Sequence, residues 1–210
     1  MVETLGTYIQ SYSDTFSDKY IFVGPSIRST NNVFEKTREK LVYISMGTVN
    51  NDMAVFYKNC IDALKDSDYQ VVLSVGSQVD IKQLEEYVIK SESKAQFHVF
   101  SFVDQIAVLE KADVFLTHCG MNSVSEALYY KVPLVMYPQT NEQKGVAFRV
   151  NELGAGIYLN SESISDIQMA AKELLQQSKY KEQANVISNS FSKCGGSKAA
   201  VEKILDVCSR

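Results

Sequence analysis

The chain has 210 residues, of which 45% are hydrophobic, so it carries enough apolar side chains for a packed core. Its 21 basic and 25 acidic residues give a net charge of −4, and no basic block points to a nucleic-acid backbone as partner. The longest apolar runs, such as "VVLSV" and "PLVMY", fall far short of the roughly 20 residues that a membrane helix requires.

The first residues and the cysteines point to a cytoplasmic protein. The opening "MVETLGTYIQSYSDTF" is polar and lacks the basic start and apolar stretch of a secretory signal. The four cysteines are scattered and form no CxxC pair, which is typical of reduced proteins. With two histidines and no cluster at ligand spacing, a metal site has little support.

In chain order, the first 30 residues are expected to be a linker or the remnant of another domain, with one short strand in "DKYIFVGPS". From residue 41 onward, short β-branched runs alternate with longer stretches of helical spacing. Strands are expected at 41–47, 69–76, 97–103, 113–118, 133–138 and 156–159. Helices are expected between them at 51–67, 80–92, 105–112, 123–130 and 141–154.

This alternation of strands and helices predicts a fold of the α/β class. Right-handed crossovers between such strands give a mostly parallel, doubly wound sheet with helices on both faces, as in a Rossmann-like domain. From about residue 163 to the end, three successive stretches show apolar positions at helical spacing and predict a helical tail.

The stretch "LTHCGMNSVSEAL" (116–128) runs from the end of an expected strand through a turn into a helix. In open α/β sheets, ligands bind at such strand ends, and a glycine before a free helix start favours an anion. Glu126 lies on the same side of that helix, where a carboxylate can accept hydrogen bonds from a sugar diol. Together these groups suggest a nucleotide site. The competing interpretation is that Asn122 or Ser123 simply caps the helix, and the GxGxxG and GxxxxGK[ST] fingerprints are absent.

A longer segment around this turn, residues 102–143, resembles the donor-binding signature of UDP-dependent glycosyltransferases with the GT-B fold, and most closely the bacterial macrolide-type enzymes. Two shorter stretches, "VYISMGTV" (42–49) and "YIFVGPSI" (20–27), look like further landmarks of that family in the expected order. The resemblance implies that the chain is the C-terminal half of such an enzyme. Residues 31–210 would then be the nucleotide-sugar domain, and residues 1–30 the linker or remnant of an acceptor domain.

The resemblance assigns one group of residues to the nucleoside. Phe102 stands where the family often has a tryptophan that stacks on uracil, and the backbone of Val103 would meet the edge of the base. Gln105 matches a residue that contacts the ribose region, and Glu126 matches the glutamate that binds the ribose.

A second group is assigned to the diphosphate and the sugar. His118 matches the histidine that hydrogen-bonds the diphosphate, where donors stabilise the charge of the leaving group. The other implied positions are the phosphate turn and the loop beside it (Gly120, Asn122, Ser123, Gly47 and Thr48) and the pair that holds sugar hydroxyls (Glu142 and Gln143).

The implied function is binding of a UDP-sugar and transfer of its hexosyl group to a small-molecule hydroxyl, with no cofactor and no metal. The acceptor site and its general base would come from an N-terminal domain, because His98, the other histidine, is expected to be structural. The chain alone is therefore expected to be inactive or weak. Two alternatives stay open: a subunit of a split two-chain transferase that acts on a lipid-linked acceptor, and a non-catalytic nucleotide-sugar-binding module.

Overall fold

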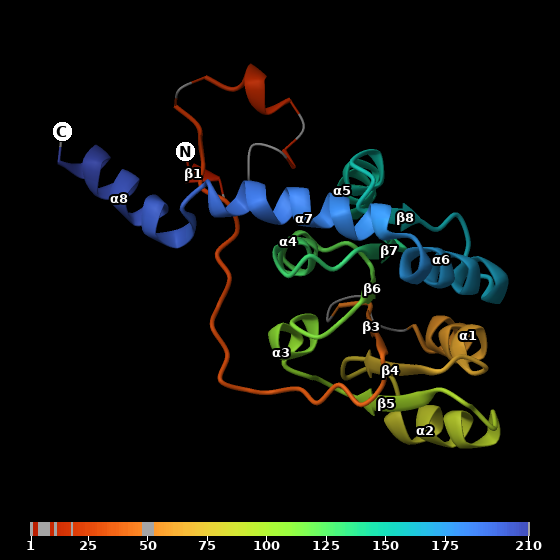
Figure 1. Cartoon of the computed structure of the whole chain (residues 1–210). Helices are drawn as coiled ribbons and strands as arrows, with labels where there is room; N and C mark the ends of the chain where they lie inside the picture. The colour runs from red at the N-terminus through yellow and green to blue at the C-terminus, as the bar shows by residue number, and fades with distance from the viewer. Residues whose placement is uncertain (1, 4–8, 11, 18, 48–52, 210) are drawn as a thin grey trace.

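A computed structural model describes residues 2–3, 9–10, 12–17, 19–47 and 53–209. Its centre is a six-stranded parallel sheet in the spatial order β5-β4-β3-β6-β7-β8 (Figure 1). This is the doubly wound order of nucleotide-binding folds, so the predicted fold class is confirmed. The strands are β3 (Lys40–Ser45), β4 (Tyr69–Ser74), β5 (Gln96–Phe100), β6 (Val114–Thr117), β7 (Leu134–Met136) and β8 (Gly156–Tyr158).

Helices cover both faces of the sheet (Figure 1). Side chains of β3 alternate between the two layers, with Val42 and Ile44 packed into one and Leu41 and Tyr43 into the other. Strands that are buried on both faces appear in a sequence as continuous apolar runs, which is why the runs were recognisable. The first layer holds α1 (Ala54–Leu64), α2 (Ile81–Lys90) and α6 (Ile164–Gln176), and the second holds α3 (Gln105–Leu109), α4 (Met121–Tyr129), α5 (Asn141–Glu152) and α7 (Ser178–Ser192).

The winding of the sheet reverses between β3 and β6. From β3 the chain winds outward through β4 to β5, then returns to β6 and winds the other way through β7 to β8. Ser45 and Thr117 lie side by side, in register, at the carboxyl ends of β3 and β6. Connections that leave neighbouring strands toward opposite faces open a crevice at this edge, and ligands of such folds bind there.

The helices and strands predicted from residue 41 onward are present, including the three tail helices α6, α7 and α8 (Gly196–Cys208). Before residue 31 the sequence predicted one strand, whereas the described residues of this segment form two, β1 (Val2–Glu3) and β2 (Ile21–Phe22), which pair in parallel. A 3-10 turn, η1 (Ser13–Thr15), lies between them. Strands of two residues are too short to show a period, so β1 left no signal in the sequence.

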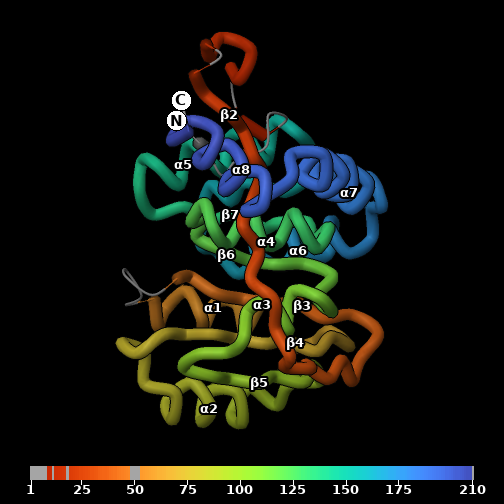
Figure 2. Tube along the Cα trace, turned by 90° about the vertical axis from the view of Figure 1, so that its left-hand side faces the viewer, coloured from red at the N-terminus to blue at the C-terminus, as the bar shows by residue number. Residues whose placement is uncertain are grey.

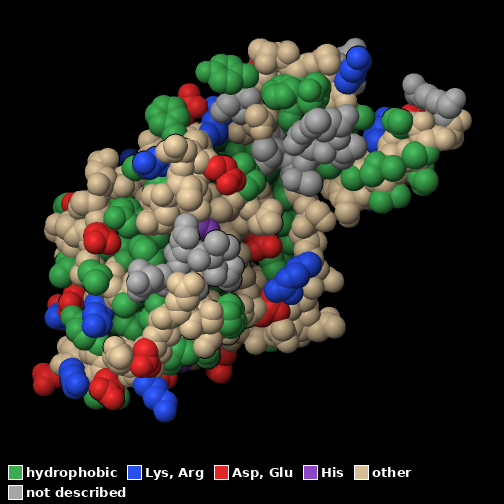
Figure 3. Space-filling view, turned by 180° about the vertical axis from the view of Figure 1, so that it is seen from behind, with side chains coloured by type: hydrophobic (Ala, Val, Ile, Leu, Met, Phe, Trp, Pro, Cys, Tyr) green, Lys and Arg blue, Asp and Glu red, His purple; other side chains and the backbone are tan. Residues whose placement is uncertain are grey.

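The last helix, α8, projects from the body of the domain (Figure 1). None of its described residues is buried, and its exposed apolar side chains include Val201, Ile204 and Leu205, at three- and four-residue spacing. Figure 3 shows apolar side chains along this projecting arm. Among the described residues, no helix has both the length and the apolar character needed to cross a membrane.

A linker runs from β2 to β3 across the layer that holds α3 and α4 (Figure 2). Asp104, directly before α3, fastens this linker by accepting hydrogen bonds from the guanidinium of Arg28, from Thr30 Oγ1 at 2.6 Å and from Asn32 Nδ2 at 2.6 Å. The Arg28 guanidinium holds the pKa of Asp104 well below its usual range, Thr30 and Asn32 act in the same direction, and burial opposes them.

Replacing Asp104 with asparagine is expected to destabilise the folded chain by about 1–2 kcal/mol at neutral pH, because charge-assisted hydrogen bonds to the linker are lost. Since the pKa of Asp104 is lower in the folded than in the unfolded chain, its contribution is present above about pH 4 and is lost as the pH falls further. Urea denaturation as a function of pH measures both effects.

The matched control is Asp66→Asn, which changes an exposed aspartate just after α1. It should change the free energy of unfolding little. Equal losses in the two variants, or a loss in Asp104→Asn that persists in acid, would contradict the role given to the Asp104 carboxylate.

Candidate functional site

A cleft of about 820 Å³ opens at the carboxyl edge of the sheet, where the winding reverses. Its walls come from the ends of β3 and β6 and from the starts of α3, α4 and α5. Every described residue that the sequence assigned to the donor site lines this cleft, whereas Thr48 lies outside the described residues. The assigned residues that line it are Gly47, Phe102, Val103, Gln105, His118, Gly120, Asn122, Ser123, Glu126, Glu142 and Gln143.

The cleft also contains residues that the sequence did not single out. Ser45 and Ser74 end the adjacent strands β3 and β4, where they pair in register. A polar residue at the carboxyl end of a buried parallel strand is a signal that could have identified both. The others carry no such local signal: Arg28, Tyr43, Met46, Met121, Gln139 and Thr140.

The start of α4 meets the cleft without a side-chain cap. Its N-cap residue is Gly120, and Asn122 and Ser123 lie within the first turn, so the simple capping interpretation of these two residues is wrong. By contrast, Asp80 caps α2 and Thr140 caps α5. The first N–H groups of α4 and its positive dipole end are therefore available to an anion in the cleft.

His118 lies between two glycines. A Cβ atom on Gly47 would come within 2.6 Å of Cε1 of His118, and a Cβ atom on Gly120 would come within 2.8 Å of its Nε2 atom. Gly47 also has a φ of +85°, a backbone conformation that residues with a side chain rarely adopt. The imidazole can occupy this place only because both neighbours lack a side chain.

The backbone turns sharply between His118 and α4. Cys119 has a φ of +68°, in the left-handed region that residues other than glycine seldom occupy. Its side chain is buried with the helices of the second layer, and its N–H donates to Thr117 Oγ1 at 3.3 Å. Such a backbone persists only where packing holds it, and here it sends Cys119 into the core while His118 lines the cleft.

The surroundings of His118 disfavour the charged form of its imidazole. Burial lowers the pKa of His118 below its usual value, while the backbone of Ser45 and the charge of Glu142 act in the opposite direction. Its Nδ1 atom is buried and makes no hydrogen bond within the described part of the chain. A neutral imidazole still has one N–H donor, so His118 can offer a hydrogen bond without a full charge.

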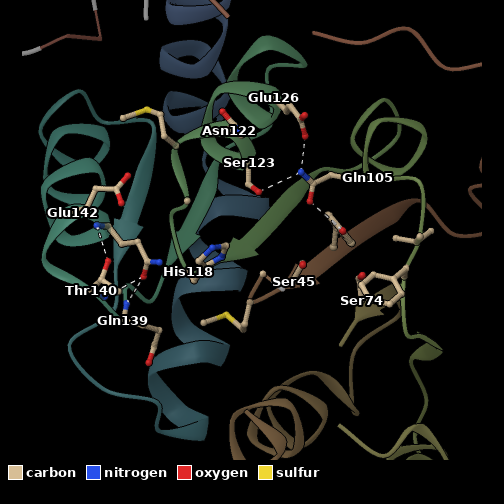
Figure 4. Close-up of a pocket in the computed structure, with 18 of the residues that line it drawn as sticks. Ser45, Ser74, Gln105, His118, Asn122, Ser123, Glu126, Gln139, Thr140 and Glu142 are labelled. Atoms are coloured by element: carbon tan, nitrogen blue, oxygen red, sulfur yellow. Dashed lines mark hydrogen bonds between the residues drawn. The ribbon is translucent and has the colours of Figure 1, made fainter. Parts of the chain in front are cut away.

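A hydrogen-bonded chain forms the wall next to α3. Gln105 donates through Nε2 to Glu126 Oε2 at 2.5 Å and to Ser123 Oγ at 3.3 Å, and its Oε1 atom accepts from the Tyr43 hydroxyl at 3.3 Å (Figure 4). Phe102, in the loop before α3, is 61% exposed, so a face of its ring is open to a ligand. The predicted proximity of Ser123 and Glu126 on one side of α4 is confirmed.

The opposite wall is the start of α5. Thr140 and Gln143 form a capping box, in which Gln143 Oε1 accepts from the backbone N–H groups of Gln139 (2.7 Å) and Thr140 (3.1 Å). The oxygen of the Gln143 amide is therefore engaged, whereas its NH₂ group has no hydrogen-bond partner among the described residues. Glu142 is exposed in the first turn of this helix.

The other histidine lies away from the cleft. His98 is on β5, its ring stacks on Phe100, and its Nε2 atom is 3.5 Å from Nε2 of Gln70. It does not line the cleft, in agreement with the structural role expected for it.

The polar groups follow one another across the cleft in three sets (Figure 4). Gln105 and Glu126 lie on one side, His118 and the start of α4 in the middle, and Thr140 and Glu142 on the other side. Chemically, such an arrangement can accept hydrogen bonds from hydroxyls at either side and bind an anion in the middle.

NMR titration of the two histidines tests the environment of His118. Its pKa is expected below the ordinary value of about 6.5, and Gly120→Ala should raise it by displacing the ring toward solvent. Because the lowered pKa means that the unfolded chain binds this proton more readily, stability should fall as the pH drops below about 6.5.

Gly145→Ala is the matched control, because a Cβ atom there meets nothing within 4 Å. It should leave the titration of His118 unchanged. A His118 that titrates like an exposed histidine in the unaltered chain would contradict the buried, neutral ring.

Comparison with known proteins shows relatives over nearly the whole chain. Residues 38–192 match the family model described as "UDP-glucoronosyl and UDP-glucosyl transferase". "Uncharacterized UDP-glucosyltransferase YojK" of Bacillus subtilis (strain 168) is 36% identical over 204 residues, which cover 94% of this chain and 49% of that protein. "NDP-glycosyltransferase YjiC" of the same organism is 37% identical over 201 residues, which cover 93% of this chain and 50% of that protein. The chain thus spans about half the length of the curated relatives it matches.

Solved structures also match nearly the whole chain, which again covers about half of each of them. The glycosyltransferase of kitacinnamycin superposes with a TM-score of 0.88 at 27% identity, over 98% of this chain and 54% of that one. The calicheamicin glycosyltransferase CalG4 superposes with a TM-score of 0.86 at 24% identity, which bears on the fold alone, over 98% of this chain and 52% of that one. The fold matches the C-terminal half of GT-B glycosyltransferases. With a family model across most of its length and relatives more than a third identical, the chain belongs to the UDP-glucoronosyl and UDP-glucosyl transferase family.

Proposed function

We propose that this chain binds a UDP-sugar and serves as the donor half of a glycosyltransferase that moves a hexosyl group to a small-molecule hydroxyl. The observation that carries the proposal is the order of groups along one cleft: an exposed ring, a tethered carboxylate, an uncapped helix start beside a histidine, and a second carboxylate. The order corresponds to a base, a ribose, a diphosphate and a sugar. The name of the family points to the same class of donor.

The nucleoside occupies the wall next to α3 in this proposal. The base stacks on the open face of Phe102, and the backbone of Val103 meets its edge. Gln105 already donates to one oxygen of Glu126, so the other carboxylate oxygen is left to accept from the ribose hydroxyls.

The diphosphate occupies the middle of the cleft. The uncapped N–H groups of α4 and the positive end of its dipole face the anion there. Asn122 and Ser123 supply side-chain donors from the first turn, and the neutral imidazole of His118 supplies another. Gly47 lets the backbone directly after β3 lie against the His118 ring at the same place.

Sugar transfer breaks the bond between the anomeric carbon and the β-phosphate oxygen, and UDP leaves with the electron pair. The acceptor oxygen forms the new bond to that carbon and gives its proton to a base. Donors fixed around the leaving phosphate stabilise its charge as it develops, which is the part of catalysis that His118 and α4 perform. Glu142 and the amide NH₂ of Gln143 hold the sugar hydroxyls at the other wall.

The acceptor site and its base come from a second domain or chain in this proposal. The curated relatives are about twice as long as the aligned segment, and His98 does not line the cleft. In this proposal residues 31–210 are the donor domain, and residues 1–30 are a linker or the remnant of an acceptor domain.

Isothermal titration calorimetry with UDP tests the donor site. Glu126→Gln and His118→Ala each remove a hydrogen-bonding group that is worth ~1.5–3 kcal/mol, so each should weaken UDP binding about 10- to 100-fold. Glu85→Gln, at an exposed position of α2, is the matched control and should leave the affinity unchanged. A chain that shows no binding at millimolar UDP would overturn the proposal.

A transfer assay with labelled UDP-glucose tests whether the acceptor site and the base lie outside this chain. The chain alone is expected to bind the donor but to transfer no sugar to added phenols or alcohols, because the acceptor site and base lie elsewhere. Efficient transfer by the chain alone would contradict this division, and loss of that transfer in His98→Ala would place the base within the chain.

A further inference from the structure

Tyr43 is a buried residue that lines the cleft and whose hydroxyl bonds a second lining residue, Gln105. It lies on β3 with 1% of its surface exposed, and its ring stacks on Phe115 at a centroid distance of 4.7 Å and an interplanar angle of 12°. The hydroxyl lies 3.3 Å from Oε1 of Gln105 and lines the cleft. Because the ring is clamped in the core, the hydroxyl occupies a fixed point at the edge of the donor site.

The hydrogen bonds from Glu126 back to Tyr43 have only one consistent direction. An ionised carboxylate can only accept, so the Gln105 atom that faces Glu126 at 2.5 Å must be the NH₂ nitrogen. The amide oxygen of Gln105 then faces Tyr43, and the phenol must be the donor. Burial raises the pKa of Tyr43 to about 12, and the charges of Glu126 and Asp104 add to this effect. Hydrogen bonds with the side chains of Ser45 and Ser74 act in the opposite direction. The phenol therefore keeps its proton at neutral pH.

We propose that Tyr43 is a positioning residue for the donor nucleotide: it fixes the amide of Gln105, which in turn fixes the Glu126 carboxylate for a ribose that carries both its hydroxyls. This inference rests on the proposed function and deepens it, because it names the part of the ligand that the wall next to α3 selects. Tyr43 itself does not touch the reacting atoms.

The fixed carboxylate has a consequence for the choice of nucleotide. A vicinal diol can place two hydrogen bonds on Glu126, and a 2′-deoxyribose can place only one. A carboxylate that is held in one orientation loses more from the missing partner than one that can turn to solvent or to another donor. The chain should therefore prefer UDP to 2′-deoxy-UDP, and this preference should depend on Tyr43.

Tyr43→Phe tests the inference because it removes the donor and keeps the ring that stacks on Phe115. Calorimetry should show UDP binding weakened about tenfold, as expected for a lost hydrogen bond that leaves a part-buried amide oxygen unpaired. Binding of 2′-deoxy-UDP should change much less, so the preference between the two nucleotides should largely disappear. On a Glu126→Gln background, Tyr43→Phe should have little further effect.

NMR provides a second readout that needs no ligand. The side-chain NH₂ signals of Gln105, identified by their absence in Gln105→Ala, should be shifted and protected from solvent exchange in the unaltered chain. They should resemble those of an exposed glutamine in Tyr43→Phe. Tyr87→Phe is the matched control, because Tyr87 also bonds a carboxylate (Asp62, 2.6 Å) but lies on α2, outside the cleft.

These experiments distinguish a failure of the inference about Tyr43 from a failure of the proposed function. A chain that binds UDP, with Tyr43→Phe weakening UDP and 2′-deoxy-UDP equally, would overturn the inference and leave the proposed function standing. Unchanged Gln105 signals in Tyr43→Phe would overturn it as well. A chain that binds neither nucleotide at millimolar concentration would overturn the proposed function and the inference built on it.

Discussion

The place of the His118 imidazole between the backbones of Gly47 and Gly120 is the constraint on which the whole cleft depends. β3 and β6 are hydrogen-bonded neighbours, so the residues that follow them leave the sheet side by side. A side chain at either glycine would overlap the ring. Because neither glycine has a side chain, Gly47, the imidazole and the start of α4 can converge on one small volume, although they come from distant parts of the sequence.

The two helices that begin beside this imidazole differ in whether side chains cap their first N–H groups. At α5, Thr140 and Gln143 close a capping box and satisfy the backbone within the protein. At α4, no side chain performs this task after Gly120. An uncapped helix start costs stability, and the cost is offset when a ligand supplies the acceptors. Of these two helix starts at the same edge, α4 is the one whose first N–H groups are free of a side-chain cap and could bind an anion.

The sequence predicted the sheet because its strands are buried on both faces and separated by amphipathic helices, so each element carries its own pattern. The cleft residues followed from a long signature that spans β6 and the starts of α3, α4 and α5. Contacts between segments that are far apart in the sequence leave no local pattern of this kind. Tyr43 and Gln105, which are hydrogen-bonded, are 62 positions apart, and Arg28 and Asp104 are 76 positions apart. The engagement of Gln143 Oε1 in a cap depends on the rotamer of that side chain, which spacing alone does not determine.

The two ends of the cleft differ in how firmly their polar groups are held. At the end next to α3, Glu126 is bonded by Gln105, and Gln105 by a tyrosine clamped in the core. At the end next to α5, Glu142 is exposed, and among the described residues no hydrogen bond holds its carboxylate. A fixed group cannot adapt to a wrong partner, so it discriminates more sharply than a mobile one. If the proposed function holds, the end next to α3 should discriminate between nucleotides more sharply than the end next to α5 discriminates between sugars.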